Sequence, residues 1–244
     1  MTTLVSESER NHNAQQCAYF EAVLKRTMVP AETPYLQRHV ESLIRFGSIS
    51  SRDRILEVGC GMGRYTLLLA RRGLQVEGLD LSAVLLDRLR AYGEGIYDGA
   101  LYAADIADPP KELIGRFDVV VALFALHHMH DLAPAFDAMF RVVKPGGRVV
   151  FLEPNPYNPL FYIQILATPG MTWQGDKGIV NMRRRVILGG LQKAGFVDPA
   201  MERFGFLPPF AVKHAAGRRI EAVLERVPFW RPMLPFQLFR AYRP

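Results

Sequence analysis

Three histidines and an aspartate stand close together near the middle of the chain, in the segment Ala125-Leu126-His127-His128-Met129-His130-Asp131. An imidazole has an ordinary pKa of about 6.5, so His127 and His128 are candidate general bases near neutral pH. A structural role stays open as the alternative, because a histidine at a strand end can simply bond a backbone carbonyl. No metal site is predicted, since this spacing does not put three histidines on one helix face and Asp131 suits a helix N-cap.

A glycine-rich run follows a short apolar segment and forms a second candidate site. Ile55 to Val58 has the character of a buried strand, glycines follow at 59, 61 and 63, and Tyr65 to Ala70 has helical apolar spacing. Glycines let the backbone approach a ligand that the next helix N-terminus faces, so this unit predicts a nucleotide site. Arg64 stands where a Gly-x-Gly-x-x-Gly motif needs its last glycine, which disfavours an NAD-dependent dehydrogenase.

The elements that would position these residues alternate along the chain from Arg54 onward. Strand-like and helical segments follow one another, which is the pattern of a parallel sheet with helices on both faces. In such a sheet the carboxyl ends of the strands meet in one ligand-binding crevice. If the fourth strand reaches the histidines, His127 and His128 point to opposite faces. The predicted strands are Ile55–Val58, Gln75–Leu79, Leu101–Ala104, Val119–Leu126 and Arg148–Leu152, with two more near 203–206 and 237–242.

The glycine turn with its leading acid, Glu57-Val58-Gly59-Cys60-Gly61-Met62-Gly63, resembles the first motif of class I S-adenosylmethionine-dependent methyltransferases. Four later segments resemble further parts of that family in the same order: Gly78–Ser82, Ala104–Ile106, Phe117–Val121 and Val142–Gly147. The resemblance implies an α/β, Rossmann-like, doubly wound fold. Its seven-stranded sheet would be mainly parallel, with helices on both faces and an antiparallel last strand. The implied cofactor is S-adenosylmethionine.

The resemblance also implies roles for single residues. The expected cofactor-binding residues are Glu57, Gly59, Gly61, Gly63, Asp80, Leu81, Asp105 and Ile106. A carboxylate about 20 residues after the glycine turn suits the two ribose hydroxyls, and the later aspartate would pair with the adenine. Methyl transfer is a displacement in which the protein positions the acceptor and removes its proton, the task assigned to His127 or His128. Glu153 and Tyr157 are the acceptor-side candidates.

The chain of 244 residues is long enough for one α/β domain with additions. We expect an N-terminal helical lid over 1–50, with helices at Gln16–Met28 and from Thr33-Pro34 to Gly47. The cofactor-binding core would span 51–153. The remainder, 154–244, would complete the core and carry two acceptor-binding insertions, 154–178 and 207–235.

Both insertions are apolar and aromatic, which suits a pocket for a hydrophobic or aromatic acceptor. The alternative is ordinary core, because Ile220, Val223, Leu224 and Val227 make a buried stripe on a predicted helix. Peripheral membrane contact stays open as well. It is favoured by the 12 Lys/Arg against 4 Asp/Glu from Ile179 onward and by Phe229-Trp230.

Composition restricts the location and the partners. With only Cys17 and Cys60, a disulfide framework is not expected, and a reducing, cytoplasmic setting fits. Acids precede the first apolar run, which argues against a signal peptide, and no run approaches the roughly 18 apolar residues of a membrane span. No nucleic-acid partner is expected, since Asp108-Pro109-Pro110 follows the third strand and lacks the aromatic of the family's amino-methylating signature.

The predicted function is therefore S-adenosylmethionine-dependent methylation of a small, hydrophobic or aromatic acceptor on oxygen, nitrogen or carbon. Two alternatives stay open. One is a non-catalytic cofactor-binding or lipid-surface module, because an intact glycine turn and Asp80 argue for cofactor binding and not for turnover. The other is a lipid methyltransferase that works at the membrane surface.

Overall fold

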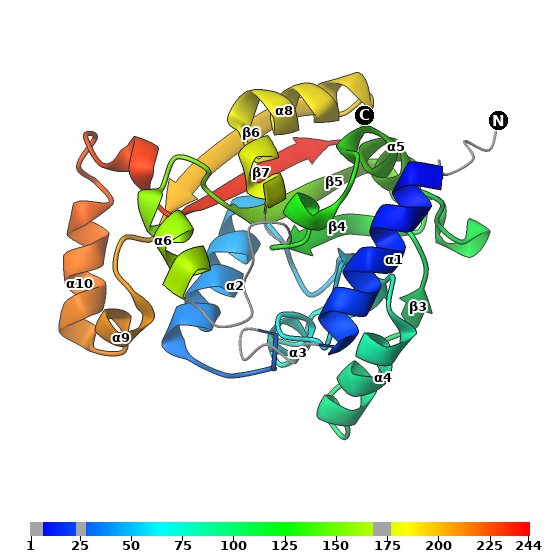
Figure 1. Ribbon diagram of the computed structural model, residues 1–244, viewed down its shortest axis with the longest axis horizontal. Coiled ribbons are helices and arrows are strands. Elements are labelled where there is room, and N and C mark those ends of the chain that lie inside the picture. Colours follow the sequence, from blue (N-terminus) through cyan, green and yellow to red (C-terminus); the bar gives the residue numbers. More distant parts are fainter. Residues whose placement is uncertain (1–6, 23–27, 168–176) are drawn as a thin grey trace.

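One seven-stranded sheet forms the centre of the computed structural model, which describes residues 7–22, 28–167 and 177–244 (Figure 1). The strand order is β3-β2-β1-β4-β5-β7-β6. The strands are β1 (Arg54–Val58), β2 (Gln75–Asp80), β3 (Leu101–Ala103), β4 (Phe117–Leu123), β5 (Val143–Pro154), β6 (Val197–Phe204) and β7 (Phe236–Tyr242). Strands β1 to β5 pair in parallel, whereas β7 is antiparallel to both β5 and β6. The predicted fold class, including the reversed last strand, is confirmed.

Helices cover both faces of this sheet (Figure 1). Helices α2 and α3 pack on one face, and α5 and α8 pack on the other. The α-helices are α1 (Glu7–Ala22), α2 (Pro34–Gly47), α3 (Thr66–Ala70), α4 (Ala83–Tyr92), α5 (Leu132–Val142), α6 (Pro159–Ala167), α8 (Arg184–Lys193), α9 (Pro209–Val212) and α10 (Ala215–Leu224). Short 3-10 helices are η1 (Lys111–Leu113), η2 (Leu126–His128), η3 (Lys177–Asn181) and η4 (Arg231–Met233).

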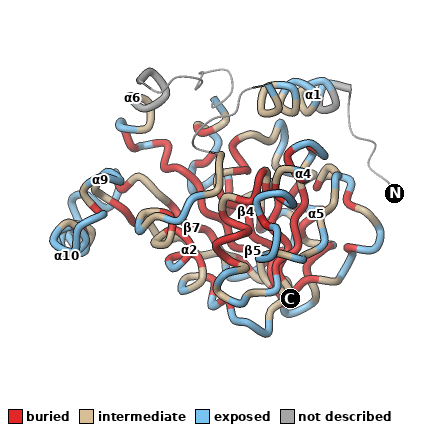
Figure 2. The backbone as a smooth tube through the Cα atoms, turned by 90° about the horizontal axis from the view of Figure 1, so that it is seen from below, coloured by how far each residue is buried: buried red, intermediate tan, exposed pale blue. Residues whose placement is uncertain are grey.

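The central strands β1 and β4 carry runs of adjacent apolar residues because both of their sides are buried. In β1, Ile55 packs on the α2 side and Leu56 on the α5 side, and in β4 Val119 and Val120 divide in the same way. Burial on both sides explains why these strands show continuous apolar runs instead of alternation. Figure 2 shows this core as the red centre of the molecule.

Three helices begin at a side-chain N-cap, among them the cap predicted at Asp131. The side chains of Thr33, Ser82 and Asp131 accept hydrogen bonds from the backbone N–H groups of Leu36, Leu85 and Ala133. Each such cap contributes about 1 kcal/mol to helix stability. The caps fix where α2, α4 and α5 begin, and α4 and α5 begin at the same edge of the sheet as the predicted site.

Several predicted boundaries are wrong. Strand β5 extends beyond Arg148–Leu152 at both ends, and β6 begins at Val197 although its strand was predicted near 203–206. Strand β4 ends at Leu123 and not at Leu126, because Phe124 adopts a left-handed backbone with φ of 56° and η2 begins two residues later. His127 and His128 therefore lie on a 3-10 turn, and the opposite-face rule of a strand does not apply to them. The first helix runs over Glu7–Ala22 instead of Gln16–Met28, and residues 23–27 lie outside the described residues.

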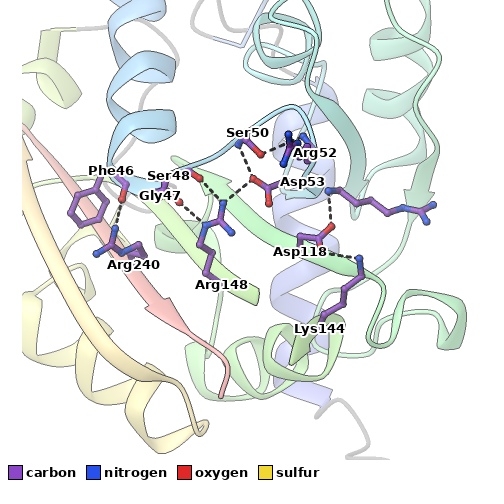
Figure 3. A network of polar contacts seen from close by, with 11 residues as sticks. Phe46, Gly47, Ser48, Ser50, Arg52, Asp53, Asp118, Lys144, Arg148 and Arg240 are labelled. Atoms are coloured by element: carbon purple, nitrogen blue, oxygen red, sulfur yellow. Dashed lines mark hydrogen bonds and ion pairs between the residues drawn. The ribbon is translucent and has the colours of Figure 1, made fainter. Parts of the chain in front are cut away.

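A polar network fastens α2 to the sheet at the end opposite the histidines (Figure 3). Arg148 on β5 donates from Nη2 to the carbonyl of Ser48 at 2.8 Å and to Asp53 Oδ2 at 2.9 Å, and from Nε to the carbonyl of Gly47. Asp118 nearby accepts from Lys144 Nζ at 2.8 Å. The Arg148 contacts hold the C-terminal end of α2, so this helix is a fixed part of the core.

The insertion at 207–235 forms α9, α10 and η4 at one end of the molecule (Figures 1 and 2). The buried stripe predicted for α10 is wrong, because Ile220, Val223 and Val227 are exposed and Glu221 is buried instead. Of the other insertion, residues 168–176 lie outside the described residues. Among the helices that the structure describes, none combines the length and apolar character needed to cross a bilayer.

Candidate active site

A cavity of about 1220 Å³ lies at the carboxyl ends of β1, β2 and β4. Its size exceeds the roughly 300–1000 Å³ of ordinary ligand pockets, so it has room for two ligands. Nine of the predicted site residues line it: Glu57, Gly59, Gly61, Asp80, Leu81, Asp105, Ile106, His127 and His128. The convergence predicted from the topology of an open parallel sheet is therefore observed. Gly63, Glu153 and Tyr157 are not among the lining residues.

The three glycines of the turn have different structural roles. A β-carbon on Gly59 would lie 2.5 Å from the β-carbon of Ala125, so this glycine allows the turn to pack against the end of β4. Gly61 has φ of 51° and nothing within 4 Å of its β-carbon position, which opens into the cavity. A β-carbon on Gly63 would meet Leu89 Cδ1 at 1.9 Å. Gly63 thus serves close packing on α4 and does not line the cavity.

Asp80 ends β2 and fixes the glycine turn. Its Oδ2 accepts from the backbone N–H of Gly61 at 2.8 Å, and its Oδ1 accepts from that of Ser82 at 3.0 Å. Burial raises the pKa of this carboxyl, while the backbone N–H donors act in the opposite direction. Each carboxylate oxygen keeps further lone-pair capacity, so Asp80 can also accept hydrogen bonds from a ligand.

Glu57 is a buried acid at the bottom of the cavity. Its Oε2 accepts from Thr66 Oγ1 at 2.7 Å. Burial raises the pKa of Glu57 from its ordinary 4.5 to about 8, and the negative charge of Asp80 adds to the rise. The carboxyl is therefore largely protonated near neutral pH, and a cation bound beside it would favour ionisation.

Helix α1 closes one side of the cavity over the loops that follow the strands. Asn13 Nδ2 donates to Asp105 Oδ2 at 2.6 Å, and the Nε2 of His12 lies 2.9 Å from the carbonyl oxygen of His128. Ser82 donates its hydroxyl to Glu21, which is also on α1. Asp105 additionally accepts from the N–H of Ala107 through Oδ1, so its loop is ordered from two directions.

His127 and Glu153 form a buried pair at the wall of the cavity. The Nδ1 of His127 lies 2.7 Å from Glu153 Oε2, while Glu153 Oε1 accepts from the N–H groups of Ala125 and Leu126 at 3.0 and 2.8 Å. A carboxylate that accepts from Nδ1–H leaves the lone pair on Nε2 of the imidazole. Gly178 on η3 packs against the carbonyl of His127, where a β-carbon would come within 1.9 Å. Glu153 thus orients the His127 ring, and Gly178 allows η3 to pack on the His127 backbone.

The other two candidates have different surroundings. His128 is part-buried, and its ring lies 4.0 Å from that of His127 and 4.9 Å from that of Phe20. Tyr157 is 56% exposed on the outer surface, where the guanidinium of Arg203 lies 5.9 Å from its ring centre. The structure therefore brings His128 to the cavity but leaves Tyr157 outside it. Glu153 reaches the cavity only through His127.

An aromatic group that sequence reasoning missed forms another part of the cavity wall. Its members, all lining the cavity, are Tyr35, His39, Tyr65, Phe124 and Phe236. His39 Nδ1 lies 2.9 Å from the hydroxyl of Tyr65, and in the described part of the chain its Nε2 has no hydrogen-bond partner. Burial lowers the pKa of His39 to about 3, so the ring is neutral. The sequence carried one signal for this group. Tyr35 and His39, two polar aromatic residues, stand four positions apart beside the apolar stripe of a predicted helix, so their side chains lie on one face.

Comparisons with known proteins show the family to which the chain belongs. A family profile described as "Methyltransferase domain" matches residues 56–151. The ubiquinone biosynthesis O-methyltransferase of Alkalilimnicola ehrlichii is 39% identical over 123 residues, which are 48% of this chain and 48% of the relative. The chain therefore spans about half the length of that relative. The protein of the same name from Bordetella avium is 33% identical over 175 residues, covering 67% of this chain and 72% of the relative.

The fold also has similar solved structures. Haemonchus contortus phosphoethanolamine N-methyltransferase 2, in complex with S-adenosyl-L-methionine, matches with a TM-score of 0.61. The identity is 20%, and the match covers 85% of this chain and 52% of that chain. At this identity the match is evidence for the fold alone.

Proposed function

Because this chain belongs to the class I S-adenosylmethionine-dependent methyltransferases, we propose that it methylates a hydroxyl oxygen of a small, apolar aromatic acceptor. The observation that carries the proposal is the His127–Glu153 pair at a cavity that a group of aromatic side chains also lines. The names of the two similar O-methyltransferases favour oxygen as the methylated atom.

The glycine turn and its acids fit the cofactor of the family. Gly61 leaves open space towards the cavity, Asp80 has accepting capacity for ribose hydroxyls, and Asp105 with Ile106 would hold the adenine. Glu57 is a buried acid whose charged form gains a favourable partner when a cation binds. S-adenosylmethionine supplies a methyl group on a positively charged sulfur when bound.

His127 would act on the acceptor as the general base. Its Nε2 takes the hydroxyl proton, while the Glu153 carboxylate, held by two backbone N–H groups, stabilises the imidazolium that forms. Removing this proton makes the oxygen a better nucleophile towards a methyl group. The neutral His39 and its surrounding rings would hold the apolar body of the acceptor in place.

Helix α1 would serve as the lid over the bound cofactor. Its contacts to the core include polar bonds from His12, Asn13 and Glu21. By contrast, α2 buries an apolar stripe in the core and is fastened by Arg148. Asn13→Ala should therefore speed cofactor dissociation in stopped-flow measurements, and an unchanged rate would contradict the lid assignment.

The function is tested with methyl-labelled S-adenosylmethionine and an alkyl-substituted catechol as acceptor. Labelled O-methyl product from the wild type, lost in His127→Ala but kept in His214→Ala, is the expected result. His214 is an exposed histidine at the start of α10 and is a matched control. Calorimetry should find cofactor affinity unchanged in both variants. Cofactor binding by the wild type without transfer to any aromatic hydroxyl would favour the non-catalytic alternative.

A further inference from the structure

Helix α10 presents its apolar stripe to the outside and its acid to the inside. Ile220 is 54% exposed and Val223 63%, whereas Glu221 between them is only 2% exposed. The Glu221 carboxylate accepts from the N–H groups of Phe206 and Leu207 at 2.7 and 2.9 Å and pairs with Arg38. These bonds fix the rotation of the helix, so the outward stripe is a built feature of the fold.

The stripe belongs to a larger apolar surface on the insertion, here called the α10 face. It comprises exposed side chains of α9, of α10, of the segment between α10 and η4, and of η4: Phe210, Ile220, Val223, Val227, Phe229, Trp230 and Met233. Phe210 and Phe229 are 72% and 74% exposed. Figures 1 and 2 show α9 and α10 at one end of the molecule, away from the sheet. An exposed apolar surface of this kind marks an interaction site.

The charges around the α10 face are mainly basic. Residues 207–235 contain five Lys/Arg and two Asp/Glu. Both acids are turned to the protein, since Glu221 and Glu225 pair with Arg38 and accept from backbone N–H groups. The basic side chains are exposed: Lys213, Arg218, Arg219, Arg226 and Arg231. Apolar side chains, among them Trp and Phe, with a basic rim are complementary to an anionic lipid surface.

We propose that the α10 face docks this protein on an anionic phospholipid bilayer. The cavity continues to this face, because Phe206, Leu207, Pro208 and Pro209 line it and Phe210 follows directly. An apolar acceptor dissolved in the bilayer then enters the cavity without crossing water. This route for the acceptor rests on the proposed function, whereas docking itself does not.

Docking is tested by sedimentation of the full chain with vesicles of phosphatidylcholine alone and with added phosphatidylglycerol, without cofactor or acceptor. The wild type should sediment with the anionic vesicles, and salt should weaken its binding. The double variant Phe210→Ser/Phe229→Ser should partition at least about tenfold more weakly. The control Ile96→Ser/Ile114→Ser changes two exposed apolar residues outside the insertion and should bind as the wild type does.

Three results would overturn the docking proposal: no binding by the wild type, equal binding to neutral and anionic vesicles, or unchanged binding by the Phe210/Phe229 variant. A wild-type dimer in size-exclusion chromatography that this variant makes monomeric would assign the face to a second copy instead. Methyl transfer to a catechol dispersed in detergent is measured separately. Its failure would refute the proposed function and leave the docking result standing.

Discussion

Replacing Gly63 with alanine should destabilise the protein more than the same change at other left-handed glycines. The backbone φ of 86° costs an alanine about 1–2 kcal/mol. Its β-carbon would also lie 1.9 Å from Leu89 Cδ1 and 3.2 Å from Leu89 Cγ. Leu89 is fully buried in a core cluster with Cys60, Leu67 and Leu86. Overpacking of this kind costs about 1–3 kcal/mol, so the expected loss is about 2–5 kcal/mol.

Two neighbouring glycines give matched controls for the backbone term. Gly73 has φ of 73° and Gly61 has φ of 51°, and neither has an atom within 4 Å of the β-carbon position. Gly73→Ala and Gly61→Ala should each lose about 1–2 kcal/mol of unfolding free energy, from backbone conformation alone. Of these glycines only Gly61 lines the cavity, so only Gly61→Ala should bind the cofactor more weakly. Its free energy of unfolding should equal that of Gly73→Ala.

The assay is urea unfolding of the wild type and the three variants, followed by calorimetric titration with S-adenosylmethionine. The midpoint reports stability if the slope with denaturant stays constant. A loss of 2–5 kcal/mol is a large part of the roughly 5–15 kcal/mol that holds a domain folded. The unfolding measurement is made without ligand, so that binding does not add to the stability.

The reasoning would be refuted if Gly63→Ala lost no more stability than Gly73→Ala, since the contact with Leu89 would then have no cost. It would also be refuted if Gly61→Ala bound the cofactor as tightly as Gly73→Ala. The first result would remove the packing role of Gly63, and the second would remove Gly61 from the cofactor site. The two conclusions are independent.

Three further predictions test other parts of the structure. The pKa of Glu57 is raised from 4.5 to about 8, so its contribution to the free energy of unfolding is fully present below pH 4.5. This contribution is lost as the pH rises through 8, by up to about 5 kcal/mol in total. Glu57→Gln should flatten this pH dependence when urea unfolding is compared at pH 6 and pH 9. His127→Ala and Glu153→Gln should both lower kcat, the former by about 10²- to 10⁴-fold, with little change in cofactor affinity; near-native rates in both would exclude the pair from catalysis. Arg148→Met removes bonds that hold the end of α2, and the free energy of unfolding in urea should fall by about 2–4 kcal/mol. Cofactor affinity should stay unchanged. A stability equal to that of the wild type would show that the network in Figure 3 does not hold α2.

The sequence predicted the parts of the site that are encoded locally. The glycine turn and Asp80 lie on one strand–turn–helix–strand unit, and their spacing alone brings them together. The end of β4 was missed because Phe124, Ala125 and Leu126 continue its apolar run. What turns the backbone out of the sheet there is Glu153, more than 20 residues later, which accepts from two of these N–H groups. A contact between distant segments has no signature in the pattern of one strand.

The rotation of α10 depends on a similar long-range contact. An amphipathic stripe shows that a helix has one apolar face, but it does not show on which side that face lies. Here the Glu221 carboxylate bonds two backbone N–H groups and Arg38, at about 1.5–3 kcal/mol for each hydrogen bond to a charged group. Burying Ile220 and Val223 instead would gain a similar amount, about 1.5–3 kcal/mol for each side chain. The arrangement with Glu221 inward and the one with Ile220 and Val223 inward are therefore close in energy. An apolar phase that covers the outward stripe would bury Ile220 and Val223 while Glu221 keeps its hydrogen bonds, as the proposed lipid-docked state does.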